Sequence, residues 1–77
     1  MSKITWSAKS NSSYLNGRRD AKTILGAVRD AIHYANGELY GEGEIVIYVD
    51  DYPVRTYEAG LLAGTARHGW KRTDRHN

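Results

Sequence analysis

The segment EIVIYVDDYPVRTYE, residues 44–58, constrains the fold of this chain more than any other part of the sequence. Two runs rich in β-branched and aromatic residues flank the sequence DDYP at 50–53, in which aspartate and proline favour a tight turn. The segment is therefore predicted to form a β-hairpin. Successive side chains of a strand point to opposite faces, so Val46 and Tyr48 point away from the neighbouring isoleucines. Both faces then carry apolar side chains, and a second layer must cover at least one of them.

A helix is predicted just before this hairpin, over Asp20–Ala35. Apolar residues recur there every three or four positions, which is the spacing of one face of an α-helix. Asp20 is the expected N-cap, and Asn36-Gly37 supplies residues that tolerate the left-handed conformation in which helices end. The helix is expected to cover one face of the hairpin. Its apolar stripe comprises Ala21, Ile24, Leu25, Val28, Ala31, Ile32 and Ala35.

A third strand is predicted near the N-terminus, where Ile4, Trp6 and Ala8 alternate with polar residues. The serines, asparagines and glycine of Ser10–Gly17 favour a loop. The predicted fold class is therefore α+β, a β-α-β-β chain in which a three-stranded antiparallel sheet carries one long helix on one face.

The segment after the hairpin fits two structures. Apolar residues at four-residue steps predict a short helix over residues 58–68, although three glycines between 60 and 69 weaken it. If this segment folds over the second face of the hairpin, Val46, Tyr48 and Tyr57 are core residues. If it does not, that face is an exposed patch that includes Arg55 and marks a partner site.

The length and composition restrict the remaining possibilities. A chain of 77 residues forms one domain, here 1–77, in which residues 71–77 are expected to be a flexible basic tail. The absence of cysteine excludes disulfides and thiolate metal sites. No apolar run has the length of a signal-peptide core or of a membrane span, so a cytoplasmic protein without membrane contact is expected.

Charge is distributed unevenly along the sequence. Residues 1–22 carry a net charge of +4, residues 23–66 a net charge of −5, and residues 67–77 a net charge of +3. Basic ends around an acidic middle are typical of a contact with nucleic acid or with a protein surface of mixed charge.

Motifs for catalysis or metal binding are missing from the sequence. His33, His68 and His76 lack the spacing of metal ligands, and Asp50 and Asp51 are interpreted as turn residues. No enzymatic activity, metal or cofactor is therefore expected.

Protein binding is the main function predicted from the sequence. The six tyrosines, with tryptophan and arginine, belong to the residue types that dominate interfaces. The partner is expected to be a larger protein or nucleoprotein complex. The predicted partner-binding residues are Tyr48, Arg55 and Tyr57 on the sheet, with Arg67, Trp70, Lys71 and Arg72 beside them.

Two alternatives remain open. An accessory DNA- or RNA-binding protein would stack bases on Tyr48, Tyr57 and Trp70 and contact phosphates through its basic ends. A homodimer could close the open face of the sheet on itself.

In size and in its β-α-β-β layout, the chain resembles several small phage-encoded proteins that inhibit host machinery, including RNA-polymerase inhibitors and anti-CRISPR proteins. This resemblance implies an inhibitor or modulator of a nucleic-acid-handling machine. It is a likeness of layout and transfers no functional residue.

Overall fold

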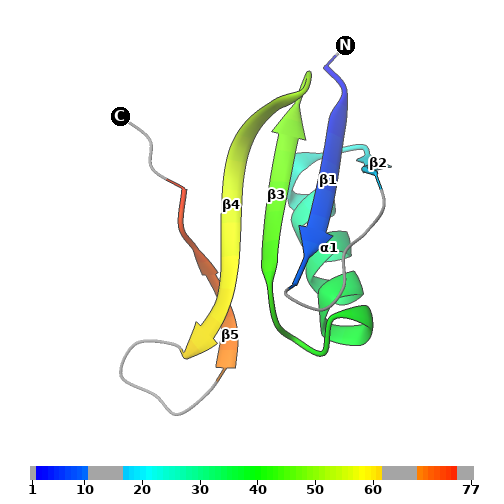
Figure 1. Ribbon diagram of the computed structural model, residues 1–77. Coiled ribbons are helices and arrows are strands. Elements are labelled where there is room, and N and C mark those ends of the chain that lie inside the picture. Colours follow the sequence, from blue (N-terminus) through cyan, green and yellow to red (C-terminus); the bar gives the residue numbers. More distant parts are fainter. Residues whose placement is uncertain (1, 11–16, 62–67, 75–77) are drawn as a thin grey trace.

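The computed structural model describes residues 2–10, 17–61 and 68–74, and in it one helix packs on a five-stranded antiparallel sheet (Figure 1). The strands follow the order β2-β1-β3-β4-β5 across the sheet. The predicted α+β class is confirmed, whereas the predicted number of three strands is wrong. The elements are β1 (Ile4–Lys9), β2 (Arg19–Ala21), α1 (Ile24–Glu38), β3 (Glu44–Val49), β4 (Tyr52–Leu61) and β5 (His68–Arg72).

The helix begins and ends later than predicted. Asp20 cannot cap it, because Asp20 lies in β2 opposite Thr5 of β1. Thr23 is the N-cap instead, and its Oγ1 accepts a hydrogen bond from the Gly26 N–H at 2.9 Å. At the other end α1 continues past Asn36 to the buried Leu39, its C-cap, whose apolar side chain joins the core. The core contact therefore outweighs the local stop signal.

Three alanines form the line along which α1 touches the sheet. Ala27, Ala31 and Ala35 are fully buried, and their small side chains allow the helix to lie close to Trp6 and the two isoleucines of β3. Leu25 departs from the predicted buried stripe, because 68% of it is exposed. At 3.6 residues per turn it lies roughly 120° around the helix from Ala31, outside the contact line.

A β-bulge in β4 decides which side chains face the helix. The hairpin turn is Asp50-Asp51, with φ of 51° and 70°, and it places Val49 opposite Tyr52. The register then shifts between Tyr48, which pairs with Pro53, and Ile47, which pairs with Arg55. Val54 is thus the extra residue, next to a proline that has no N–H for a regular ladder.

This bulge corrects the predicted faces. Without it, Arg55 and Tyr57 would lie on the same side as Tyr48. One extra residue moves all following side chains to the other face, so Arg55 and Tyr57 lie on the helix side with Ile47 and Ile45.

The prediction of a helix over residues 58–68 is wrong, because both ends of that range lie in strands. Residues 58–61 continue β4, and His68 begins β5, with Gly60 opposite Gly69. Glycine is a poor helix former, and pairing with β4 supplies the backbone hydrogen bonds that a helix would have made. The rest of the segment, 62–67, lies outside the described residues. The described residues of the C-terminal segment therefore widen the sheet, and none of them covers its second face.

The predicted tail begins within the sheet. Lys71 and Arg72 lie in β5, and the Thr73 N–H donates to the carbonyl of Thr56 at 2.9 Å. Residues 75–77 lie outside the described part of the chain.

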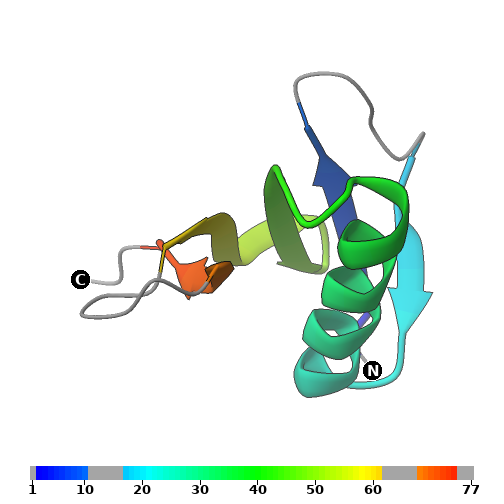
Figure 2. The same cartoon turned by 90° about the horizontal axis from the view of Figure 1, so that it is seen from below.

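The helix covers only part of the sheet. It packs on β1, β2 and β3, whereas β4 and β5 project beyond it, as the view from below shows (Figure 2). No helix in the described ranges is long and apolar enough to cross a membrane.

Candidate protein-binding surface

The helix-side surface of β4 and β5 gathers two aromatic and two basic side chains. Cross-strand pairing places Tyr57 opposite Arg72 and Ala59 opposite Trp70, and the bulge adds Arg55 to the same side. Tyr57 is buried at the border of the core, whereas Trp70 is half-buried and Arg72 is exposed. We call this surface the wing face and define it by Arg55, Tyr57, Trp70 and Arg72.

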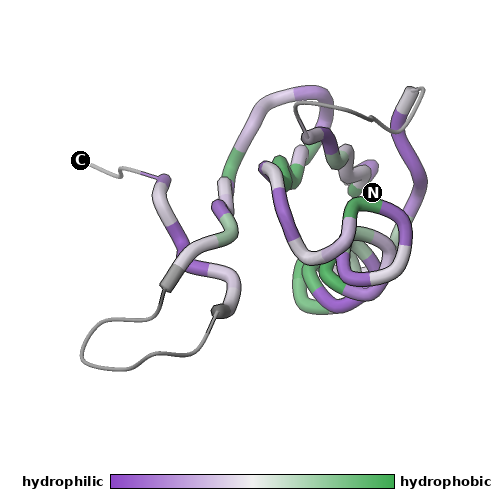
Figure 3. The backbone as a smooth tube through the Cα atoms, turned by 60° about the horizontal axis from the view of Figure 1, so that its bottom comes forward, coloured by the Kyte–Doolittle hydropathy of each residue, from purple (hydrophilic) through white to green (hydrophobic). Residues whose placement is uncertain are grey.

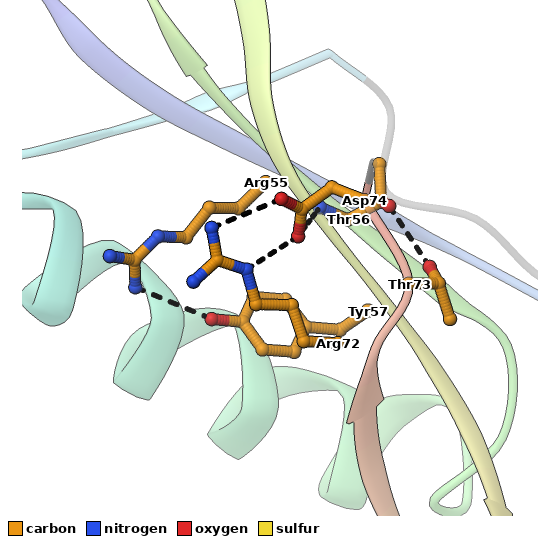
Figure 4. A network of polar contacts seen from close by, with 6 residues as sticks. All are labelled: Arg55, Thr56, Tyr57, Arg72, Thr73 and Asp74. Carbon is orange, nitrogen blue, oxygen red and sulfur yellow. Dashed lines mark hydrogen bonds and ion pairs between the residues drawn. The ribbon is translucent and has the colours of Figure 1, made fainter. Parts of the chain in front are cut away.

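Hydrogen bonds hold one end of the wing face in place (Figure 4). The carboxylate of Asp74 accepts two bonds from Arg72, from Nε at 2.6 Å and from Nη2 at 3.0 Å. Its Oδ1 also accepts from the Thr56 N–H at 3.4 Å. Asp74 thereby supplies an acceptor where the β4–β5 ladder ends, and it orients the guanidinium of Arg72.

This arrangement shifts the pKa of both charged groups. The hydrogen bond from Arg72 is the main cause that lowers the pKa of Asp74 to about 2, and the Thr56 N–H adds to it. The same bond to Asp74 raises the pKa of Arg72 above its usual value. Both groups are therefore charged throughout the physiological pH range.

Trp70 connects the wing face to the end of the helix. Its indole Nε1 donates to Asn36 Oδ1 at 3.0 Å. Beside it lies a hollow of about 370 Å³ lined by Trp70 and Asn36, together with Gly69, Tyr40 and residues 41–42. Tyr40 at its rim is 86% exposed. The hollow is large enough to receive a side chain of a binding partner.

The flank of α1 next to the wing face is apolar. Asn36 faces β5 through its bond to Trp70, and Ile32, Val28 and Leu25 precede it on the same side of the helix at steps of three or four residues. The side of the helix turned toward β4 and β5 is accordingly coloured hydrophobic in Figure 3. Val28 and Ile32 pack partly on the core, whereas Leu25 is exposed. We call Leu25, Val28 and Ile32 the helix flank.

The wing face carries a cation that forms no ion pair within the described part of the chain. Arg55 donates from Nη1 to the Tyr57 hydroxyl at 3.5 Å. Of the two ion pairs within the described residues, one uses Arg72 and the other uses Arg18, so neither involves Arg55. The wing face and the helix flank together present aromatic and aliphatic surface beside positive charge.

The structure brings together four of the seven partner-binding residues predicted from the sequence: Arg55, Tyr57, Trp70 and Arg72. Tyr48 lies on the opposite face, under the guanidinium of Arg18. Lys71 also lies on that face, opposite Glu58. Arg67 lies outside the described residues.

That opposite face carries a row of charges. The register aligns Lys9, Glu44, Glu58 and Lys71 across β1, β3, β4 and β5. Two carboxylates lie between the two lysines, so this face does not form a continuous basic surface.

Sequence reasoning missed three contributors to the surface. The sequence predicts Leu25 in the buried stripe, Asn36 at the helix stop and Asp74 in the tail. The sequence could have indicated the exposure of Leu25, because Leu25 lies at the margin of the apolar stripe. The roles of Asn36 and Asp74 depend on hydrogen bonds with Trp70 and Thr56, which are distant in sequence.

Within the described ranges, no group of three or more histidine, aspartate or glutamate side chains is placed to hold a metal ion. No protein-family model, no curated protein and no solved structure matches the chain.

Proposed function

We propose that this protein is a non-enzymatic binding module whose partner is another protein, bound at the wing face and the helix flank. The observation that carries the proposal is that Arg55, Trp70 and Arg72 gather around the buried Tyr57 on the helix side of β4 and β5, beyond the strands on which α1 packs. Tryptophan, tyrosine and arginine are the residues most enriched among those that dominate binding energy.

The chemistry of the surface favours a partner with apolar and acidic side chains. Leu25 and the indole of Trp70 offer apolar contact, while Arg55 offers a cation that no described carboxylate neutralises. A partner that binds only the folded state would also stabilise this small domain against unfolding.

Nucleic-acid binding has less support from the geometry. The three side chains expected to stack bases are divided between two faces, with Tyr48 on one and Tyr57 and Trp70 on the other. On the face of Tyr48, Glu44 and Glu58 would repel phosphate.

A pull-down from bacterial lysate tests the proposal, with nuclease treatment and mass-spectrometric identification of the retained proteins. The variant Trp70→Ala should release the partner, since truncation of a central anchor costs about 2 kcal/mol or more, roughly 30-fold in affinity. Lys71→Ala is the matched control, because Lys71 is adjacent in β5 but points to the opposite face. It should retain the partner.

Three results would contradict the proposal. Recovery of nucleic acid, or loss of the retained proteins after digestion, would establish the nucleic-acid alternative. A partner lost with Lys71→Ala but kept with Trp70→Ala would place binding on the opposite face. Retention of only a second copy of this chain would establish a homodimer. Circular dichroism of both variants shows whether the fold is intact.

The retained protein also tests the modulator role. We propose that the partner belongs to a nucleic-acid-handling machine, a role suggested by the resemblance in size to small phage-encoded inhibitors. Inhibition of the purified machine by the wild type but not by Trp70→Ala would support it, and binding without any effect on activity would contradict it.

A further inference from the structure

The outer edge of β5 is open to pairing. β5 is the last strand of the sheet, and nothing in the described ranges pairs with its outer side. An edge strand presents a row of N–H and C=O groups that another strand can bind. At the opposite edge, β2 is only three residues long, so β5 is the longer of the two edges.

The hydrogen-bond pattern identifies the groups that point outward. The Thr73 N–H donates to Thr56, so Thr73 is directed toward β4. The backbone N–H and C=O groups of successive residues point alternately to the two sides of a strand, so those of Lys71 also point toward β4. The N–H and C=O of Trp70 and Arg72 consequently point away from the sheet.

These outward groups lie beside the proposed binding surface. The side chains of Trp70 and Arg72 both belong to the wing face, two positions apart in β5. A strand added at this edge would place alternate side chains next to the indole and its hollow and next to the guanidinium. Asp74 engages Nε and Nη2 of Arg72, which leaves Nη1 without a described acceptor.

The charge of β5 selects the kind of strand that fits. β5 contains Lys71 and Arg72 and no acidic residue. Two copies of β5 would bring like charges together, and basic residues on edge strands oppose such self-pairing. A segment with a carboxylate near Arg72 and Arg55 would gain charge-assisted hydrogen bonds.

We infer that an extended acidic segment of the partner protein adds to β5 as a sixth strand. The segment carries an apolar and an acidic residue two positions apart, the first beside Trp70 and the second beside Arg72. This inference rests on the proposed function, because it names how the protein partner binds at the wing face.

Selection from a random peptide library displayed on phage tests the inference, with the intact protein as bait. The selected peptides should share an acidic and an apolar residue two positions apart. Hydrogen exchange followed by NMR then locates the binding. A bound peptide should slow exchange of the Trp70 and Arg72 amides by roughly ten-fold or more, because strand pairing protects amides from exchange.

Two variants test the charge preference. Arg72→Gln should lower the affinity for the acidic peptides by roughly ten-fold, which corresponds to the loss of one charge-assisted hydrogen bond. Lys71→Gln, the matched control on the other face, should leave their affinity within about two-fold. Equal weakening by both variants would show attraction to net charge and would overturn the inference.

Two further results would also overturn it. Peptides that bind without protecting the Trp70 and Arg72 amides would exclude strand addition and leave the proposed function in place. A library that yields no binding peptide would exclude an extended segment as the occupant. The lysate pull-down then decides separately whether a folded protein binds.

Discussion

The guanidinium of Arg18 lies over the ring of Tyr48, 3.6 Å from its centroid, and donates from Nη1 to Asp51 at 2.9 Å. Thr5 lies between Tyr48 and Asp20 in the register of the sheet. The Arg18 side chain therefore crosses over Thr5, and Thr5 is only 4% exposed although α1 lies on the other face of the sheet. One arginine thus connects the start of β2 to the hairpin across β1.

Replacing Arg18 by alanine should lower the free energy of unfolding by about 1 kcal/mol, since a partly exposed cation–π contact and an exposed ion pair each contribute up to roughly that amount. Arg18→Lys should lose less, because it keeps the charge but not the flat stacking group. Urea denaturation measures both changes. An Arg18→Ala protein as stable as the wild type would show that the contact contributes nothing.

Asp74 should make stability depend on pH in the acid range. Its pKa in the folded protein is lowered to about 2 by the hydrogen bond from Arg72, below the value of roughly 3.9 in an unfolded chain. Between these values the unfolded state binds a proton that the folded state does not, so the contribution of Asp74 is complete above about pH 4 and is lost as the pH falls toward 2.

The comparison with Asp74→Asn isolates this contribution from the other carboxyl groups. The wild type should exceed the variant in unfolding free energy at pH 7, and the difference should shrink as the pH falls from about 4 toward 2. Urea denaturation at several pH values measures it. A difference in unfolding free energy that stays constant between about pH 4 and pH 2 would show that the pKa of Asp74 is not lowered in the folded protein.

The position of the N-cap can be tested by two substitutions. Thr23→Ala removes the acceptor of the Gly26 N–H and should cost about 1 kcal/mol of stability. Thr23→Ser keeps the hydroxyl and should restore most of it. Asp20→Ala, the cap expected from the sequence, should change stability by less than about 0.5 kcal/mol, as exposed surface positions do. Thermal unfolding measures these changes. A larger loss of stability in Asp20→Ala than in Thr23→Ala would show that Asp20 is the N-cap.

Two glycines should respond in opposite ways to alanine. Gly43 has φ of 107°, and a Cβ there would lie 2.0 Å from the Lys9 carbonyl oxygen. Gly43→Ala should therefore cost more than about 2 kcal/mol through strain and backbone displacement. Gly37 lies within α1 with open space around it, so Gly37→Ala should stabilise by up to about 1 kcal/mol. Denaturation midpoints measure both, and tolerance of alanine at position 43 would contradict the close approach.

Several elements were predictable because their signals are local. The alternation of Ile4, Trp6 and Ala8 predicted β1, and the aspartates at 50 and 51 predicted the hairpin turn. The apolar periodicity predicted a helix that covers Ile45 and Ile47, and both are buried beneath α1. In each case the deciding interaction is a turn preference or a side-chain period within a few residues.

The predictions failed where distant residues decide. The capping role passed from Asp20 to Thr23 because pairing with β1 takes Asp20 into a strand. The segment after Glu58 continues as strand because β4 and β5 satisfy each other's backbone groups. Asp20 pairs with Thr5 and Gly60 pairs with Gly69, and the side-chain period of each segment taken alone does not show these pairings.

Local sequence patterns account for the α+β class, the long helix, the hairpin and most of the core, because side-chain periodicity and turn chemistry act over a few residues. Which side chains share a surface depends on the tertiary structure. The bulge at Val54 turned Arg55 and Tyr57 toward the helix, and the pairing of β5 brought Trp70 and Arg72 beside them. Strand register is set by the pairing between strands, and a shift of one residue exchanges the two faces of a sheet.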